Sequence, residues 1–330
     1  MTQPSECAHT PMSPLVGIVV TTRNEARNIS ACLTSIRDQT YGPIEVVVVD
    51  NNSTDGTQAL VEPFACTLIT AGPERSAQRN TGFRALHGVD IVGYLDADMV
   101  LGPAVVQAVV QAIAVDVGAV YVDERIQGHT SFAKARRFER SFYTGSPVDC
   151  VRFVASSALD AAGDFDERLT GPEDWDFDRR VRAVTTTSVV TCPHWLDESC
   201  WLRCPAVDGR RASSGCSLIH HNEGESSLLR YARKKAYYSA GMTRYIQKWG
   251  KSDPIVRAQF SPVNRMLGIF LRRGQWRRVL QHPFLFCAVL ATRLTVGLTF
   301  LTARGRSENG STGGEKVAPP AVENSRRARS

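Results

Sequence analysis

The fold of this chain is decided by the stretch IVGYLDAD, residues 91–98. Its first five residues are mostly apolar and predict a buried β-strand. The strand ends in Asp96 and Asp98, two carboxylates separated by one alanine. Such a pair can bind one cation together with phosphate oxygens, because Mg²⁺ usually takes one or two carboxylates and completes its shell from a substrate. The alternative is a solvated turn, since Asp-X-Asp is common.

Two further apolar runs precede this strand, and helical patterns lie between them. Residues 16–21 and 44–49 are rich in valine and isoleucine, as expected of strands covered on both sheet faces. Apolar residues at helical spacing predict a helix over 29–37, and a second helix is predicted over 76–86. Alternation of strands and helices indicates an α/β fold with a doubly wound, mostly parallel, Rossmann-like sheet.

Polar residues follow each of these three strands. Thr22 comes after the first strand, Asp50 after the second and Asp96 after the third. In open α/β sheets, ligands bind beyond the carboxyl ends of the strands. We therefore expect the three side chains to lie at one edge of the sheet and to line a binding site.

Asp50 and two arginines are further candidates for ligand contacts. Asp50 ends a run of four valines, and an acidic residue there can accept a hydrogen bond from a base or a ribose hydroxyl. It could equally form an Asx turn or cap the next helix. Arg75 and Arg79 lie four residues apart, on one face of a predicted helix. Their guanidinium groups suit a pyrophosphate, although a solvated helix face is the alternative.

The acidic pair Glu173-Asp174, which precedes Trp175, is a candidate general base. A carboxylate that is partly dry beside an aromatic ring has a raised pKa and can accept a proton. An acidic helix start is the alternative, because negative charge is favourable there. His220 and His221 could bind a metal or a phosphate, but such a pair is more often structural.

Composition and charge limit the class of protein. The chain has 330 residues, of which 43% are hydrophobic and 22% charged, as in ordinary globular proteins. Residues 225–283 hold 13 Lys or Arg against 2 Asp or Glu, whereas the net charge of the whole chain is only +6. This basic region suggests an anionic partner. It lacks a known nucleic-acid-reading motif, so we expect no nucleic-acid partner.

The nine cysteines are expected to be reduced. Residues 1–14 show no secretory pattern, and thiols stay reduced in proteins that are not exported. A zinc site is the alternative for one cysteine- and histidine-rich stretch, although its spacings do not match common zinc modules. Its members would be Cys192, His194, Cys200, Cys204, Cys216 and His220.

Taken together, these motifs resemble those of family 2 glycosyltransferases. The matching segments are VGIVVTTRNE (16–25), VVVDNNSTDGT (47–57), GPERSAQRNTG (72–82), LDAD (95–98), FDE (165–167) and EDWD (173–176). Each segment is short, but their common order is specific. The resemblance covers roughly residues 15–183.

The resemblance implies a GT-A fold, in which a nucleotide-binding half and an acceptor half form one domain. It also implies an inverting transfer from a nucleotide-sugar donor, for which we favour a uridine diphosphate sugar. By the family's motifs, Thr22, Glu25 and Asp50 hold the nucleoside, and Arg79 lies beside it.

The family's remaining motifs concern the metal and the base. They imply that Asp96 and Asp98 hold a divalent ion, Mg²⁺ or Mn²⁺, together with the diphosphate, and that Asp98 is the nearer ligand. Asp174 would be the base that deprotonates the acceptor hydroxyl. His221 resembles a family histidine that lies near the metal and the diphosphate.

The C-terminal region favours a peripheral membrane contact. Residues 284–300 are mostly apolar and are flanked by arginines, while Arg293 lies in their middle. A central charge disfavours a membrane span, whereas basic flanks suit a helix at the surface of an anionic membrane. A span and a helix packed on the globular domain are the alternatives. Similar tails occur in relatives that act on lipid-linked sugars, so we expect a location at the cytoplasmic membrane face. The expected acceptor is polyprenyl-linked, or a secondary-metabolite or cell-envelope glycan intermediate.

These observations predict an order of domains. We expect disordered ends at 1–14 and 304–330, a glycosyltransferase domain at 15–225 with a nucleotide-binding half (15–100) and an acceptor half (101–225), and a basic helical region at 226–303. Two other functions remain open. A sugar-nucleotide nucleotidyltransferase would carry a glycine-rich basic loop after its first strand, where this chain has TTRNE (21–25). A non-catalytic protein of the same fold would be favoured by loss of the aspartates, which are present.

Overall fold

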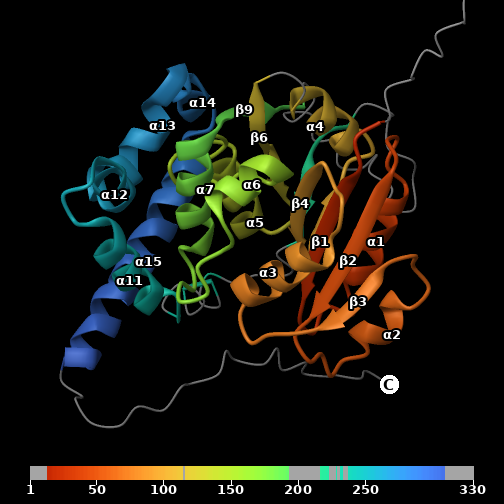
Figure 1. Cartoon of the computed structure of the whole chain (residues 1–330). Helices are drawn as coiled ribbons and strands as arrows, with labels where there is room; N and C mark the ends of the chain where they lie inside the picture. The colour runs from red at the N-terminus through yellow and green to blue at the C-terminus, as the bar shows by residue number, and fades with distance from the viewer. Residues whose placement is uncertain are drawn as a thin grey trace, which may run out of the picture.

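A seven-stranded sheet forms the centre of the computed structural model, which describes residues 13–113, 116–192, 216–222, 228, 231–232 and 237–308 (Figure 1). Its strands, in spatial order, are β3 (Thr67–Thr70), β2 (Ile44–Asp50), β1 (Val16–Thr22), β4 (Ile91–Asp96), β8 (Phe153–Ala155), β6 (Val117–Val122) and β9 (Thr186–Val190). A smaller sheet joins β5 (Met99–Leu101), β10 (Ile219–His221) and β7 (Glu124–Ile126).

The large sheet is mostly parallel. β1 pairs in parallel with β2 and β4, β2 with β3, and β6 with β9. Only β8 runs antiparallel, between β4 and β6. The predicted doubly wound α/β fold is confirmed, and the predicted strands at 16–21, 44–49 and near 91–95 agree with β1, β2 and β4.

Helices cover both faces of the large sheet. One face packs on α1 (Ile29–Arg37), α2 (Thr57–Val61) and α4 (Val105–Ile113), and the other on α3 (Arg75–Ala85), α6 (Ser156–Ala162) and α7 (Glu173–Val184). Each face of the sheet has its own hydrophobic core, and successive residues of β1 pack in different cores because strand side chains alternate between faces. Ile18 and Val20 lie in one core, and Val19 lies in the other. This covering on both sides explains the nearly continuous apolar runs in the sequence.

The loop after β1 bends sharply before α1 begins. Asn24 has a φ of 54°, in the left-handed region that asparagine tolerates better than most residues. Its side-chain oxygen accepts a hydrogen bond from the Thr54 amide at 2.8 Å, and its own amide donates to Ser53 Oγ at 2.8 Å. The loops that follow β1 and β2 are therefore fixed to each other at the edge where the parallel strands end.

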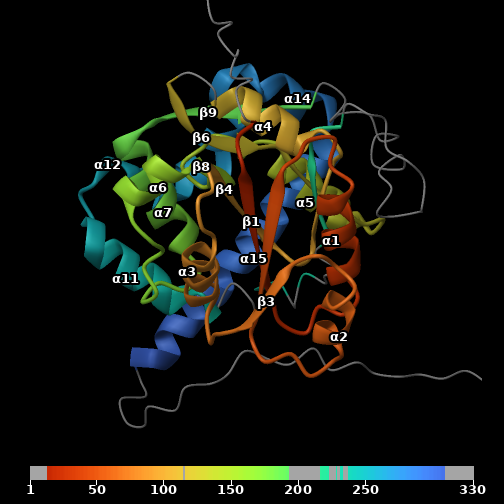
Figure 2. The ribbon, with the colours of Figure 1, turned by 45° about the vertical axis from the view of Figure 1, so that its right-hand side comes forward.

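The C-terminal region is helical, as predicted. Its described elements are α11 (Ser239–Trp249), α12 (Pro254–Phe260), the π-helical turn η1 (Asn264–Gly268), α13 (Ile269–Leu271), the 3₁₀ turn η2 (Arg272–Gly274), α14 (Trp276–Gln281) and α15 (Pro283–Glu308). Helix α15 continues five residues past the predicted boundary at 303. Figure 2 shows it as a long rod that passes behind the large sheet, and it packs on α5 (Ser131–Arg140).

Arg293, in the middle of α15, is paired with the globular domain. Its Nε donates to Glu139 Oε1 at 2.8 Å, and its Nη2 donates to the Tyr143 hydroxyl at 3.1 Å. Its guanidinium carbon also lies 4.6 Å from the centre of the Phe270 ring. Within the part of the chain that the structure describes, no helix combines the length and apolar character needed to cross a membrane.

Glu139→Gln is predicted to destabilise the protein by roughly 3 kcal/mol at neutral pH, because Arg136 and Arg293 would stay buried without their carboxylate. Urea unfolding of the full chain measures the change. Glu62→Gln, at an exposed position, is the matched control and should change the free energy of unfolding by less than about 0.5 kcal/mol.

The same variant tests the pH dependence of stability. Burial alone would raise the pKa of Glu139, but Arg136 and Arg293 lower it from 4.5 to about 2. The stabilisation is therefore complete above about pH 4.5 and is lost as the pH falls toward 2. The difference between the wild type and Glu139→Gln should shrink over this window. A difference that stays constant would show that the ion pair does not stabilise the fold.

Candidate active site

The ends of three parallel strands meet at one edge of the sheet, as predicted. Thr22 is the register partner of Asp50, and Thr21 is the partner of Asp96. The Thr21 hydroxyl donates to Asp96 Oδ1 at 3.1 Å. The edge where ligands bind in this fold therefore carries the residues that the sequence singled out.

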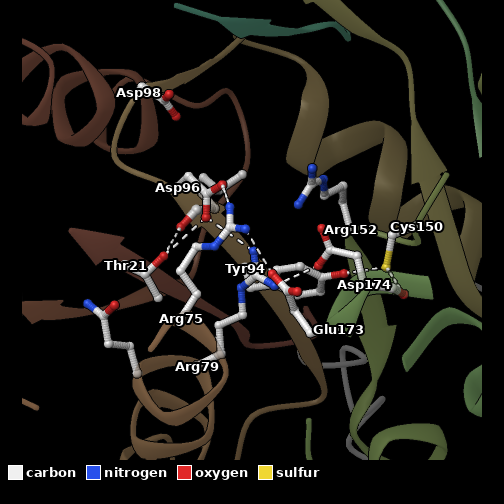
Figure 3. Close-up of polar contacts among 12 residues, drawn as sticks. Thr21, Arg75, Arg79, Tyr94, Asp96, Asp98, Cys150, Arg152, Glu173 and Asp174 are labelled. Carbon is white, nitrogen blue, oxygen red and sulfur yellow. Dashed lines mark hydrogen bonds and ion pairs between the residues drawn. The ribbon is translucent and has the colours of Figure 1, made fainter. Parts of the chain in front are cut away.

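Arg79 joins two carboxylates that lie far apart in the sequence. It is fully buried, its Nη2 lies 3.1 Å from Asp96 Oδ1, and its Nη1 lies 2.6 Å from Asp174 Oδ1. The rings of Tyr94 and Phe165 lie 4.7 and 4.9 Å from its guanidinium carbon. Figure 3 shows the guanidinium between the end of β4 and the start of α7.

Arg75, one helical turn earlier on α3, makes a second bridge. Its Nη1 lies 3.4 Å from Asp96 Oδ2, and its Nη2 lies 2.8 Å from Glu173 Oε1. The same Nη2 donates to the Tyr238 hydroxyl at 3.4 Å. The predicted pair of arginines on one helix face thus faces three carboxylates, and a ligand phosphate would find both cations already positioned.

The three carboxylates differ in proton affinity. Burial favours the neutral form of Asp96, but Arg79 and Arg75 outweigh it and hold its pKa far below the ordinary value. Partial burial would also raise the pKa of Asp174, but Arg79 and Arg152 outweigh this effect and lower the pKa. Burial raises the pKa of Glu173 despite Arg75. The predicted raised pKa in the Glu173-Asp174 pair therefore occurs at Glu173, whereas the arginines beside Asp174 lower its pKa.

The start of α7 is held in place by a close packing contact with the C-terminal region. Gly171 has a φ of 103°, and the chain then enters α7 through Pro172. A side chain at Gly241 of α11 would collide with the Thr170 carbonyl, since its Cβ would lie 1.9 Å from the oxygen. Only glycine permits this approach, which seats α11 against the loop that carries Glu173 and Asp174.

Asp98 lies apart from the arginine cluster, in the turn between β4 and β5 (Figure 3). Its Oδ2 lies 3.2 Å from His221 Nε2, and Nδ1 of the same ring lies 3.8 Å from Glu124 Oε2. Strand β10 creates this arrangement, because it pairs with β5 and β7 and sets His221 opposite Met99 and Ile126. His221 thus lies beside Asp98, and its predicted position near a metal and a diphosphate stays a prediction.

The two aspartates differ in their capacity to hold a metal ion. Both oxygens of Asp96 already face Arg75, Arg79 or Thr21. Asp98 Oδ1 is buried, and no hydrogen-bond partner for it occurs among the described residues. A hard cation would satisfy this oxygen, so the residues fit a divalent ion at Asp98.

No larger metal-binding cluster is present in the described ranges, where no three His, Cys, Asp or Glu side chains are grouped to hold an ion. Of the alternative zinc ligands, His194, Cys200 and Cys204 lie outside the described residues. Cys216 Sγ lies 3.8 Å from His220 Nε2. Cys192, Cys216 and His220 are all buried.

The residues assigned to the nucleoside are bound mainly to their own loops. Asp50 accepts hydrogen bonds from the Ser53 amide at 2.9 Å and from Gln58 Nε2 at 2.7 Å. The bond from the Ser53 amide is that of an Asx turn, the alternative role predicted for Asp50. Glu25 accepts from Asn28 Nδ2 at 2.6 Å. The Thr22 hydroxyl is buried, and the described residues offer it no hydrogen-bond partner.

Two residues of the site gave no signal in the sequence. Arg152 precedes β8, and the antiparallel direction of β8 brings its first residues to the edge where the parallel strands end. Its Nε lies 2.7 Å from Glu124, whereas its buried Nη1 has no hydrogen-bond partner among the described residues. Tyr238 comes from the C-terminal region. A lone arginine or tyrosine has no distinguishing motif, so only an alignment or a structure could find them.

The chain shows sequence similarity to known glycosyltransferases. The profile of the family described as Glycosyl transferase family 2 matches residues 17–156. Glycosyltransferase AglE of Haloferax volcanii is 38% identical over 94 residues, which cover 26% of this chain and 31% of that protein. A PGL/p-HBAD biosynthesis glycosyltransferase of Mycobacterium bovis is 30% identical over 193 residues, which cover 54% of this chain and 73% of that protein.

The extent of these matches varies. The match spans only 29 to 32% of the length of AglE and of two other glycosyltransferases, from Nostoc and Bacillus subtilis. Among solved structures, the mannosyltransferase PcManGT of Pyrobaculum calidifontis, in complex with GDP-Man and Mn²⁺, superposes with a TM-score of 0.54 at 20% identity. The superposition covers 90% of this chain and 84% of that one. It confirms the predicted GT-A-type fold.

Arg79→Met is predicted to raise the pKa of Asp174, because the largest source of positive charge beside this carboxylate disappears. Titration of the side-chain carboxyl carbons by NMR measures the change. Arg79→Lys keeps a cation and should give a smaller rise.

Arg84→Met is the matched control for this variant. Arg84 lies on the same helix but pairs with Asp164 at the surface, so its loss should leave the pKa of Asp174 unchanged. An unaltered Asp174 titration in Arg79→Met would show that the ion pair does not set the charge of this carboxylate.

Proposed function

Because this chain belongs to glycosyl transferase family 2, we propose that it transfers a sugar from a nucleotide-sugar donor to an acceptor hydroxyl, with inversion at the anomeric carbon. The observation that carries the proposal is the bridge made by Arg79 between Asp96 at the end of β4 and Asp174 at the start of α7. It joins a strand-end carboxylate on the nucleotide-binding half to a carboxylate on the acceptor half.

The donor diphosphate would bind beside Arg75 and Arg79. Both guanidinium groups are held at the sheet edge, where ligands bind in this fold. The nucleoside would occupy the neighbouring ends of β1 and β2, next to Thr22, Glu25 and Asp50. The Thr22 hydroxyl, which has no hydrogen-bond partner in the described part of the chain, supports this placement, because a nucleoside would satisfy it.

Asp174 would act as the general base. As the acceptor oxygen attacks the anomeric carbon, its proton passes to the Asp174 carboxylate, a new C–O bond forms, and the bond from the anomeric carbon to the diphosphate oxygen breaks. Attack on the face opposite the leaving group inverts the configuration. The neighbouring arginines favour the negative charge that grows on the departing diphosphate.

The pairing of Asp174 with Arg79 suggests how the base becomes stronger. While Arg79 holds it, Asp174 is ionised, but its pKa is lowered and its affinity for a proton is weak. A diphosphate that takes over the Arg79 contact would remove part of this positive charge. The pKa of Asp174 would then rise, so the base would gain strength only after the donor is bound.

A divalent ion, Mg²⁺ or Mn²⁺, would be held by Asp98, with Asp96 nearby and His221 beside it. The buried Asp98 oxygen that has no partner among the described residues supports this placement. When bound, the ion supplies positive charge to the leaving diphosphate. The presence of Mn²⁺ in PcManGT agrees with this proposal but concerns another protein.

The acceptor is proposed to be a lipid-linked, polyprenyl-type glycan or another cell-envelope intermediate, reached from the cytoplasmic face of a membrane. The basic, apolar C-terminal region supports a peripheral membrane contact. A uridine diphosphate sugar remains the first candidate donor, and a guanosine diphosphate sugar is the second.

Asp174→Asn and Asp98→Ala are each predicted to reduce turnover by at least about a hundredfold, because the first removes the proton acceptor and the second removes a metal ligand. Turnover is measured as nucleotide diphosphate released from the donor. Asp160→Asn, at an exposed position, is the control and should retain wild-type turnover. Near-normal turnover in Asp174→Asn would exclude it as the base.

A screen of sugar nucleotides tests the function as a whole. The full chain should show a higher thermal midpoint with one nucleotide-sugar class, in the presence of Mg²⁺ or Mn²⁺. Chelation of the metal should remove both the shift and the release of nucleotide diphosphate, and added Mn²⁺ should restore them. No shift and no release with uridine or guanosine diphosphate sugars would contradict the proposed donor class.

A further inference from the structure

Helix α15 presents an apolar stripe on the side that faces away from the domain. Its exposed residues recur at intervals of three and four positions, which places them on one face of the helix. They are Phe284, Cys287, Ala291, Leu294 and Leu298. Phe284 is 89% exposed, the highest value among the exposed large hydrophobic side chains. The usual arrangement, in which a surface helix turns polar residues outward, is reversed here.

The opposite face of α15 is firmly attached to the domain. Val289 and Thr292 are buried, and Val289 packs in a cluster with Phe138 and Phe142. The ion pair between Arg293 and Glu139 lies on the same contact with α5. The apolar stripe therefore cannot be hidden by a simple rotation of the helix, since that would break a buried ion pair and a packed cluster.

A second group of apolar side chains is exposed on the short helices that precede α15. Val263, Leu267 and Leu271 are spaced four residues apart, and so are Trp276 and Leu280. Val263 is 71% exposed and Leu280 is 70% exposed. Large apolar side chains gathered in one region, rather than scattered singly, mark an interaction surface.

The charge of this region is of one sign. From Pro254 to Ser307 the sequence has nine arginines and neither Asp, Glu nor Lys. Arg272 and Arg277 are exposed, and Arg277 lies 5.6 Å from the ring of Trp276. Arginine next to exposed tryptophan and leucine is typical of segments that lie in the headgroup region of a bilayer.

We propose that the outer faces of η1, α13, η2, α14 and α15 form a docking surface for an anionic membrane. The apolar side chains would enter the headgroup boundary, and the arginines would contact lipid phosphates. A second copy of the chain fits less well, because two copies would bring two acid-free, arginine-rich surfaces together. This inference rests on the proposed function, because it specifies which surface makes the membrane contact. Its test, however, does not require glycosyl transfer.

The test is co-sedimentation of the full chain with vesicles, without donor or metal. The wild type should bind vesicles of phosphatidylcholine mixed with phosphatidylglycerol at least about tenfold more tightly than vesicles of phosphatidylcholine alone, and high salt should weaken this binding. Phe284→Ser/Leu294→Ser/Leu298→Ser should bind the anionic vesicles about tenfold less tightly, because the stripe loses its apolar contacts. Arg272→Glu/Arg277→Glu should reduce binding by a similar factor.

A matched control changes three exposed apolar residues elsewhere. Leu60→Ser/Leu68→Ser/Val184→Ser should bind the anionic vesicles as the wild type does, since these side chains lie outside the docking surface. Failure of the wild type to bind anionic vesicles would overturn the proposal. So would a dimer in light scattering that the stripe variant dissociates while vesicle binding is unchanged. Nucleotide diphosphate release, measured separately, decides the proposed glycosyl transfer whatever the vesicles show.

Discussion

The structure of the candidate site depends on one buried cation. Arg79 is fully enclosed, and a charge in that position is tolerated only with close carboxylates. It finds them on Asp96, at the end of β4, and on Asp174, at the start of α7. The rings of Tyr94 and Phe165 fill the remaining space around the guanidinium. The same ion pairs connect the strand end to the helix start, and they lower the pKa values of both carboxylates.

A second buried network connects the site to the C-terminal helix. Glu124 contacts Arg152 and Arg140 and lies near His221, whose ring reaches Asp98. Arg140 belongs to α5, and the preceding residue, Glu139, pairs with Arg293 of α15. The helix with the apolar outer face therefore packs on the same α5 that contributes Arg140 to this network. A membrane that docks there would lie beside the segment that we propose to bind the acceptor.

The sequence located the site well, but it did not determine which carboxylate of the Glu173-Asp174 pair has the raised pKa. It placed Thr22, Asp50 and Asp96 at one edge, because parallel strands end together. It also predicted a raised pKa in the Glu173-Asp174 pair, and the raised pKa falls on Glu173 alone. The reason is that Arg79 and Arg152 approach Asp174, and proximity between residues so far apart in the chain cannot be inferred from local pattern.

By itself, the sequence determined the order of strands and helices, the two-sided core and the motif residues at strand ends, because these follow from hydrophobic periodicity and from local loop chemistry. Only the tertiary structure decided which residues from distant segments join the site and its supporting network. The antiparallel direction of β8 brought Arg152 to the site, strand β10 carried His221 to Asp98, and α5 supplied the partner of Arg293. Each of these depends on contacts between segments distant in the sequence, whose free energy is set by packing of the whole chain rather than by any short stretch of it.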